Sequence, residues 1–244
     1  MKLYALSDLH LSLTAPYRPG VDADLQLKKP MSMFGQVWRD YFCRLEQNWR
    51  AVVGEDDWVM VAGDVSWAMT LSKARYDLDY LGSLPGKKIM IKGNHDYWWS
   101  SVSQVRAAVS PSITVLQHSA VAAGAYAVCG TRGWLLPQHS EFKEEEDRKL
   151  YHREIERFRM ALDDAAKLKK PIIAMLHYPP LLKANHDSPF CELLREYQVY
   201  TCVYGHIHGD MESAFEGVKD GVRYCNSSID RLDFRPLLIG EARG

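Results

Sequence analysis

Short, fully apolar runs recur along this chain and alternate with longer segments in which apolar residues repeat at every third or fourth position. Runs such as Trp58 to Ala62 and Ile172 to Leu176 are typical of buried strands. The spacing in 36–53, 72–81 and 144–169 instead predicts amphipathic helices. Strands that alternate with helices in this way predict an α/β fold.

The bulk composition narrows the class of protein further. The 244 residues are 47% hydrophobic and carry a net charge of -1, so no overall basic field favours nucleic acid or a membrane surface. No run approaches the ~20 apolar residues of a membrane span. The five cysteines form no CxxC pair and are typical of reduced thiols in a cytoplasmic protein. With no repeat or linker, 1–244 is predicted to form a single domain with a long irregular loop at about 14–35.

Five of the predicted strands end in side chains that can bind metal or transfer protons. The endings are Asp8-Leu9-His10, Gly63-Asp64, Gly93-Asn94-His95-Asp96, His177 and Gly205-His206-Ile207-His208. Ligands of open α/β sheets bind at the carboxyl ends of the strands, so these endings can converge on one site. Residues two apart in extended chain point to the same side, which lets Asp8 and His10 face one cavity together.

Apart from His95 and Asp96, the endings offer two carboxylates, one amide oxygen and four imidazoles. This mixture suits first-row ions such as Mn, Fe, Zn or Ni. Seven ligands are too many for one tetrahedral site and fit two divalent transition-metal ions, which could clamp both oxygens of a phosphoryl displacement. A GD turn or a lone strand-end histidine is weak evidence by itself, whereas all five endings in this order favour a functional site.

The same endings resemble the motifs of the calcineurin-like metallophosphoesterase superfamily, which are D-x-H, G-D, G-N-H-[DE], a single H and G-H-x-H. They extend from Asp8 to His208, and none is missing. The resemblance implies two mixed β-sheets packed face to face as a sandwich, with α-helices outside in a four-layer arrangement. It also implies a small prokaryotic-type phosphohydrolase that attacks a phosphodiester or a phosphomonoester with a metal-bridged hydroxide.

The resemblance further implies a role for each residue of the motifs. One ion would be held by Asp8, His10 and His208 and the other by Asn94, His177 and His206, with Asp64 as the bridge. His95 would not be a ligand; it would stand beside the leaving group and donate a proton or a hydrogen bond. Asp96 would orient the His95 imidazole, as carboxylates commonly do for histidine.

Several features have more than one interpretation. Arg132 follows a strand and could reach a substrate phosphate or form a surface ion pair. The aromatic residues at 97–99 are interpreted as packing of the following helix, ahead of substrate stacking. The loop at 14–35 could be a substrate lid, a basic rim or an insertion. The expected partner is a small phosphate ester, and the alternative to an enzyme is a non-catalytic metal-binding scaffold or regulatory module with the same fold.

Overall fold

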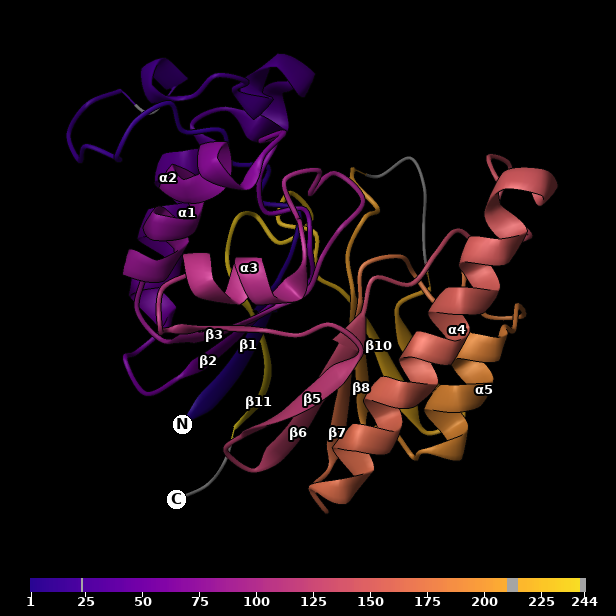
Figure 1. The fold of residues 1–244 in the computed structure, drawn as a ribbon. Helices are drawn as coiled ribbons and strands as arrows, with labels where there is room; N and C mark the ends of the chain where they lie inside the picture. The colour runs from indigo at the N-terminus through magenta and orange to yellow at the C-terminus, as the bar shows by residue number, and fades with distance from the viewer. Residues whose placement is uncertain (23, 210–214, 242–244) are drawn as a thin grey trace.

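Two mixed β-sheets form the centre of the molecule in the computed structural model, which describes residues 1–22, 24–209 and 215–241 (Figure 1). The first sheet has five strands in the order β11-β1-β2-β3-β4. Its strands are β1 (Lys2–Leu6), β2 (Trp58–Val61), β3 (Lys87–Met90), β4 (Ile113–Val115) and β11 (Leu237–Glu241). All neighbours pair in parallel except β11, which is antiparallel to β1.

The second sheet has six strands in the order β5-β6-β7-β8-β10-β9. They are β5 (Ser119–Ala123), β6 (Tyr126–Thr131), β7 (Ile172–Leu176), β8 (Thr201–Tyr204), β9 (Gly217–Lys219) and β10 (Val222–Asn226). The central strands β6, β7, β8 and β10 pair in parallel, and the edge strands β5 and β9 are antiparallel.

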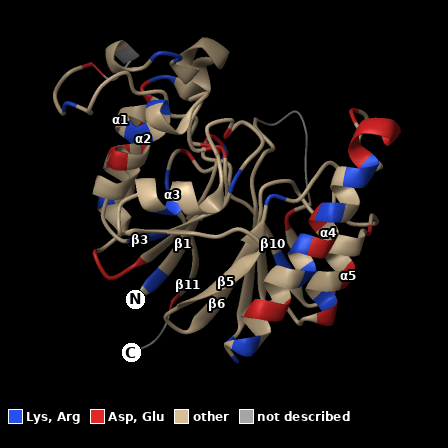
Figure 2. Ribbon diagram, viewed as in Figure 1, with Lys and Arg blue, Asp and Glu red and all other residues tan. Residues whose placement is uncertain are grey.

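Helices cover the outer face of each sheet (Figure 1). The first sheet packs against α1 (Tyr41–Val52), α2 (Leu71–Ser83) and α3 (Val102–Ala108), and the second against α4 (Glu144–Lys167) and α5 (Pro189–Glu196). In Figure 2, acidic and basic residues alternate along the exposed side of α4. The predicted four-layer arrangement, with two sheets between two helical layers, is confirmed.

Side chains that alternate between two buried faces explain the continuous apolar runs of β2 and β7. In β2, Met60 packs into the cluster between the two sheets, whereas Val59 and Val61 pack toward the helices. Met175 of β7 meets the same inner cluster from the second sheet. Because both faces of β2 and β7 are covered, apolar residues occupy consecutive positions in these two strands.

The structure corrects some of the predicted element boundaries. The helix expected at 36–53 starts only at Tyr41, because Asp40 has a left-handed backbone (φ 52°) that separates α1 from the short 3₁₀ helix Gln36–Trp38. The expected irregular loop contains two further 3₁₀ helices, Asp24–Gln26 and Met31–Phe34. Strands β5, β9 and β11 were not predicted.

Two observations on the structure bear on the predictions made from composition. All five cysteines are free, and four of them are buried. Within the described ranges, no helix has both the length and the apolar character needed to cross a membrane.

Candidate metal centre

The motif residues meet at one end of the two sheets, because the strands before them run in parallel. Asp8 and His10 follow β1, Asp64 follows β2, and Asn94 to Asp96 follow β3. On the second sheet, His177 follows β7, and His206 and His208 follow β8. The carboxyl ends of parallel strands lie at the same edge, so five separate segments deliver their side chains to one place.

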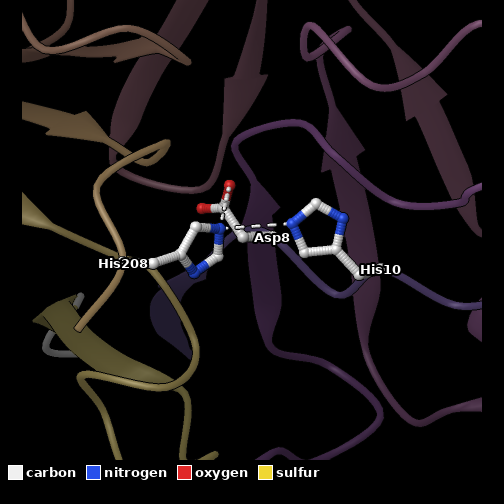
Figure 3. Close-up of side chains that lie close together, drawn as sticks. All are labelled: Asp8, His10 and His208. Atoms are coloured by element: carbon white, nitrogen blue, oxygen red, sulfur yellow. Dashed lines mark hydrogen bonds and ion pairs between the residues drawn. The ribbon is translucent and has the colours of Figure 1, made fainter. Parts of the chain in front are cut away.

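A first group of metal-binding side chains consists of Asp8, His10 and His208 (Figure 3). The Nε2 atoms of His10 and His208 lie 3.2 Å apart, and Nε2 of His208 lies 3.5 Å from Oδ1 of Asp8. Figure 3 shows the two rings turned toward each other with the Asp8 carboxylate beside them. Asp8 and His10 are buried, and His208 is half-buried.

A second group surrounds Asp64 and is continuous with the first. Oδ2 of Asp64 lies 3.9 Å from Nε2 of His10 and 3.6 Å from Nε2 of His177. Oδ1 of Asn94 lies 2.5 Å from Nε2 of His177 and 2.9 Å from Nδ1 of His206. Asp64 therefore stands between the imidazoles of the two groups, and Asp8, Asp64 and His177 also form a set close enough to hold an ion.

The spacing of these donors fits divalent metal ions. Donor atoms arranged tetrahedrally around an ion at bond lengths of about 2.1 Å lie roughly 3.4 Å apart. The separations that join His10 to His208, His208 to Asp8, and Asp64 to His177 are 3.2, 3.5 and 3.6 Å. The residues present therefore fit the metal ions that the motifs imply.

Protonation states in the site agree with a role in metal binding. Nδ1 of His177 lies 3.0 Å from the carbonyl oxygen of Ala62 and must carry the hydrogen, which leaves a lone pair on the inward Nε2. Burial lowers the pKa of His177 to about 4 and, with neighbouring imidazoles, that of His206 to about 2. Both rings are therefore neutral at pH 7, the form of imidazole that binds metal.

The carboxylate of Asp64 is buried near two other acidic side chains, Asp8 and Asp96. Burial raises the pKa of Asp64 well above its usual value, and the nearby charges of Asp96 and Asp8 raise it further. A bound divalent cation reverses this effect, because it stabilises the ionised carboxylates around it.

Four site residues have a left-handed backbone, which is uncommon for residues other than glycine. Their φ angles are 61° for Asp8, 48° for His10, 54° for Asp64 and 73° for His206. Such conformations cluster at functional sites, where the surrounding structure holds them. The strands end at these residues, so each backbone turns sharply at the point where its side chain enters the centre.

Glycines of the motifs are required by close approach. A Cβ at Gly93 would collide with Oδ1 and the backbone nitrogen of Asp64. A Cβ at Gly205 would collide with the side chains of Ser7 and Asp8. The backbone at Gly93 therefore lies directly against Asp64, and the backbone at Gly205 lies directly against Ser7 and Asp8. A larger residue at either glycine would push the contacting segments apart.

Residues outside the motifs hold the ligands in place, and sequence reasoning missed them. Oδ1 of Asp230 lies 3.0 Å from Nδ1 of His208, and its Oδ2 accepts a hydrogen bond from the Gly209 amide. The hydroxyls of Ser7 and Ser228 both donate to Oδ2 of Asp8. Partners of this kind fix the orientation of the ligands, and a carboxylate beside the far nitrogen of an imidazole also raises the basicity of that ring.

The structure corrects the expected role of Asp96. Its Oδ2 accepts hydrogen bonds from the amides of Asp64 (2.9 Å) and Gly93 (2.8 Å). Its Oδ1 accepts from the amides of Val65 and Ser66 and from the Trp98 indole. None of these five donors belongs to His95, so Asp96 holds the backbone around Asp64 and does not orient the His95 imidazole.

His95 lies at the border of the centre and has an aromatic environment. Its ring centroid is 4.6 Å from that of Trp67, 5.7 Å from that of His10 and 6.0 Å from that of Tyr97. Its Nδ1 is buried and has no hydrogen-bond partner among the described residues. The backbone amide of His95 donates to Oδ1 of Asp64 (2.8 Å), which fixes the position of the histidine relative to the centre.

The aromatic residues after His95 divide into two kinds. Trp98 and Trp99 are buried in the core of the first sheet, in agreement with their interpretation as packing residues. Tyr97 is 55% exposed and faces outward beside His95.

Arg132 lines a basic cavity of about 310 Å³. Its guanidinium carbon is 4.2 Å from the Trp134 ring centroid. Lys92, Arg153 and Arg157 line the same cavity, and the one carboxylate there, Glu154, already accepts hydrogen bonds from Thr131 and Arg157. No described carboxylate lies within 4.0 Å of the Arg132 guanidinium, so the described residues show no direct ion pair at this side chain.

The fold and the site together define a class of protein, namely two-sheet α/β domains with Asp and His side chains gathered at the strand ends. The family model described as calcineurin-like phosphoesterase matches residues 1–210. The chain belongs to this family.

Solved structures resemble the chain at low identity. One is the crystal structure of a protein of unknown function, AQ665, from Aquifex aeolicus, with 15% identity over 97% of this chain and 95% of that one and a TM-score of 0.49. A second has 14% identity over 91% of this chain and 88% of its own, with a TM-score of 0.51, and supports the fold alone. A search of curated proteins gives no significant match.

Proposed function

We propose that the protein is a phosphohydrolase that uses two divalent transition-metal ions to hydrolyse a small-molecule phosphodiester or phosphomonoester. The observation that supports this most directly is the position of Asp64, whose Oδ2 lies 3.9 Å from Nε2 of His10 and 3.6 Å from Nε2 of His177. A carboxylate between two groups of imidazoles fits the bridging ligand of a binuclear centre. The free cysteines fit a cytoplasmic location, and 1–244 would form one domain.

The ligands divide between two ions. Asp8, His10 and His208 would hold one ion, Asn94, His177 and His206 the other, and Asp64 would bind both. When bound, the two ions supply an activated water and neutralise charge on the phosphate. Mn, Fe, Zn and Ni all suit imidazole mixed with carboxylate and amide oxygen.

His95 is the proposed proton donor to the leaving oxygen. It is not tied to a carboxylate, and the hydrogen bond from its amide to Asp64 fixes its distance from the centre. General acid catalysis typically contributes on the order of 10²–10⁴-fold, so His95→Asn should lower kcat by that factor. Metal content should stay near the wild-type value, and an unchanged kcat in a metal-loaded variant would refute this role.

Arg132 is a weaker candidate for binding the substrate phosphate. Its half-buried guanidinium has no carboxylate partner among the described residues, and a planar fork of donors matches phosphate oxygens.

The decisive experiment combines metal reconstitution with two chromogenic esters. Protein stripped by chelator is reloaded singly with Mn, Fe, Zn, Ni or Mg and assayed on p-nitrophenyl phosphate and bis-p-nitrophenyl phosphate. Asp64→Asn, which removes the charge of the bridging ligand, is the matched control. We expect hydrolysis that needs about two ions per chain and is lost in the control.

Each other result has a distinct meaning. Tight binding of two ions without turnover of either ester would leave a very selective enzyme or a metal-binding scaffold. A protein that binds no metal would refute the proposal as a whole.

A further inference from the structure

A cavity of about 760 Å³ opens beside the metal centre. Its walls are Ser12 to Thr14, Lys28 and Lys29, Trp67 to Met69, the first two turns of α2 and Tyr97. This volume lies in the range of small-molecule sites and far exceeds what a single phosphate group occupies.

The cavity adjoins the face of the centre where His95 lies. Trp67 lines the cavity, stacks on His10 with ring centroids 4.6 Å apart, and lies 4.6 Å from the His95 ring. Tyr97, whose ring centroid lies 6.0 Å from that of His95, also lines the cavity. Trp67 is therefore a wall that this cavity shares with the His95 side of the centre.

The charged side chains of the cavity are mainly basic. Lys28 and Lys73 are exposed at its rim, and the Nζ of Lys29 lies 3.4 Å from the Trp67 ring centroid. In the part of the chain that the structure describes, none of these ammonium groups has a carboxylate within 4.0 Å. Three cations that have no carboxylate partner and face one cavity favour an anionic ligand.

The single carboxylate in the lining does not offset these charges. Asp77 is buried and accepts hydrogen bonds from the Leu13 amide (2.8 Å) and the Ser66 hydroxyl. Burial raises the pKa of Asp77 to about 7, so part of the population is neutral at neutral pH. The cavity therefore keeps an excess of positive charge.

We propose that this cavity binds the leaving group of the phosphate ester, and that the leaving group has an anionic group of its own. The proposal rests on the phosphohydrolase activity proposed above. In the reaction, the oxygen of water forms a bond to phosphorus and the bond from phosphorus to the leaving oxygen breaks. The leaving oxygen takes up a proton at His95, and the released alcohol keeps its anionic group near Lys28 and Lys73.

The test compares two esters that differ only in the charge of the leaving group. The metal-reconstituted protein is assayed on 3-carboxyphenyl phosphate and on 3-carbamoylphenyl phosphate, which have nearly the same shape. We expect the ratio of kcat/KM for the anionic ester to that for the neutral ester to fall roughly tenfold in the double variant Lys28→Gln/Lys73→Gln. The wild-type ratio should also fall as salt is added, because both lysines are exposed.

Lys149→Gln is the matched control, because Lys149 is an exposed lysine of α4 on the other sheet. Its ratio should equal that of the wild type. A ratio that is the same in the wild type and the double variant would overturn the proposal.

Failure of the proposed phosphohydrolase activity can be distinguished from failure of the cavity proposal. If the wild type hydrolyses neither ester, the proposed function is refuted on these substrates. Ligand-detected NMR with 3-hydroxybenzoate and 3-hydroxybenzamide then tests the cavity by itself. Selective binding of the benzoate that is lost in the double variant would support an anion-selective cavity, and equal binding of both would overturn it.

Discussion

Replacing Asp96 with asparagine should destabilise the backbone around the metal centre while leaving the His95 side chain intact. The carboxylate accepts five hydrogen bonds, two at Oδ2 and three at Oδ1. Asparagine has a single acceptor oxygen, and its best placement keeps that oxygen at the position with three donors. The amide NH₂ then faces the backbone N–H groups of Asp64 and Gly93, which lose their acceptor.

The cost can be worked out from these contacts. Asp96 is fully buried, so water cannot replace the lost acceptor. Each buried donor left without a partner costs about 1–3 kcal/mol, and two give roughly 2–6 kcal/mol. Typical domains have a free energy of unfolding of about 5–15 kcal/mol, so the variant should lose a large part of its stability.

Urea unfolding of the metal-free proteins followed by circular dichroism measures this loss directly. Asp96→Asn should also bind metal more weakly, because Asp64 and Gly93 belong to the displaced turn. Ser103→Ala, at an exposed position of α3, is the control and should unfold like the wild type. A loss of less than about 1 kcal/mol with normal metal affinity would refute the reasoning, since it would mean that the five contacts do not hold the turn.

Three further predictions address other contacts of the site. Asp230→Asn removes the carboxylate beside Nδ1 of His208, and metal titration should show about 10–100-fold weaker binding; unchanged affinity would contradict this. Arg132→Gln should lower kcat/KM for a phosphate ester by about 10–100-fold at normal metal content, and equal kinetics would exclude Arg132 from substrate binding. Burial raises the pKa of Asp77 to about 7, above the unfolded value of about 3.9, so wild-type stability should fall as the pH rises between these values. Asp77→Asn removes this dependence, and urea unfolding at pH 4.5 and pH 8 should show the variant gaining on the order of 2–4 kcal/mol relative to the wild type.

The ligands could be predicted from the sequence because each follows an apolar strand. Strand ends can be located from hydrophobic runs, and parallel pairing brings them to one edge whatever the intervening chain does. Their supporting partners could not be predicted in the same way. Ser228 lies 220 residues from Asp8 and belongs to no motif, so only the folded chain shows that its hydroxyl donates to that carboxylate.

Irregular backbone limited the prediction of the fold. The periodicity of 36–53 is helical throughout, but the left-handed Asp40 interrupts it, and aspartate is also tolerated within helices. Strand β11 pairs with β1 at the edge of the first sheet. At such a position, tertiary contacts decide the structure more than the intrinsic propensity of the residues does.

Asp96 shows a more general limit on what a motif can reveal. In Gly93-Asn94-His95-Asp96, adjacency in sequence favours a pair formed by the histidine and the aspartate next to it. In a tight turn, however, consecutive side chains point in different directions. The Asp96 carboxylate reaches back to the amides of the Gly63-Asp64 turn, while His95 faces Trp67. The motif thus combines a proposed metal ligand, a proposed proton donor and a residue that fixes the neighbouring strand end. A substitution at each of the three positions should therefore impair the protein for a different physical reason.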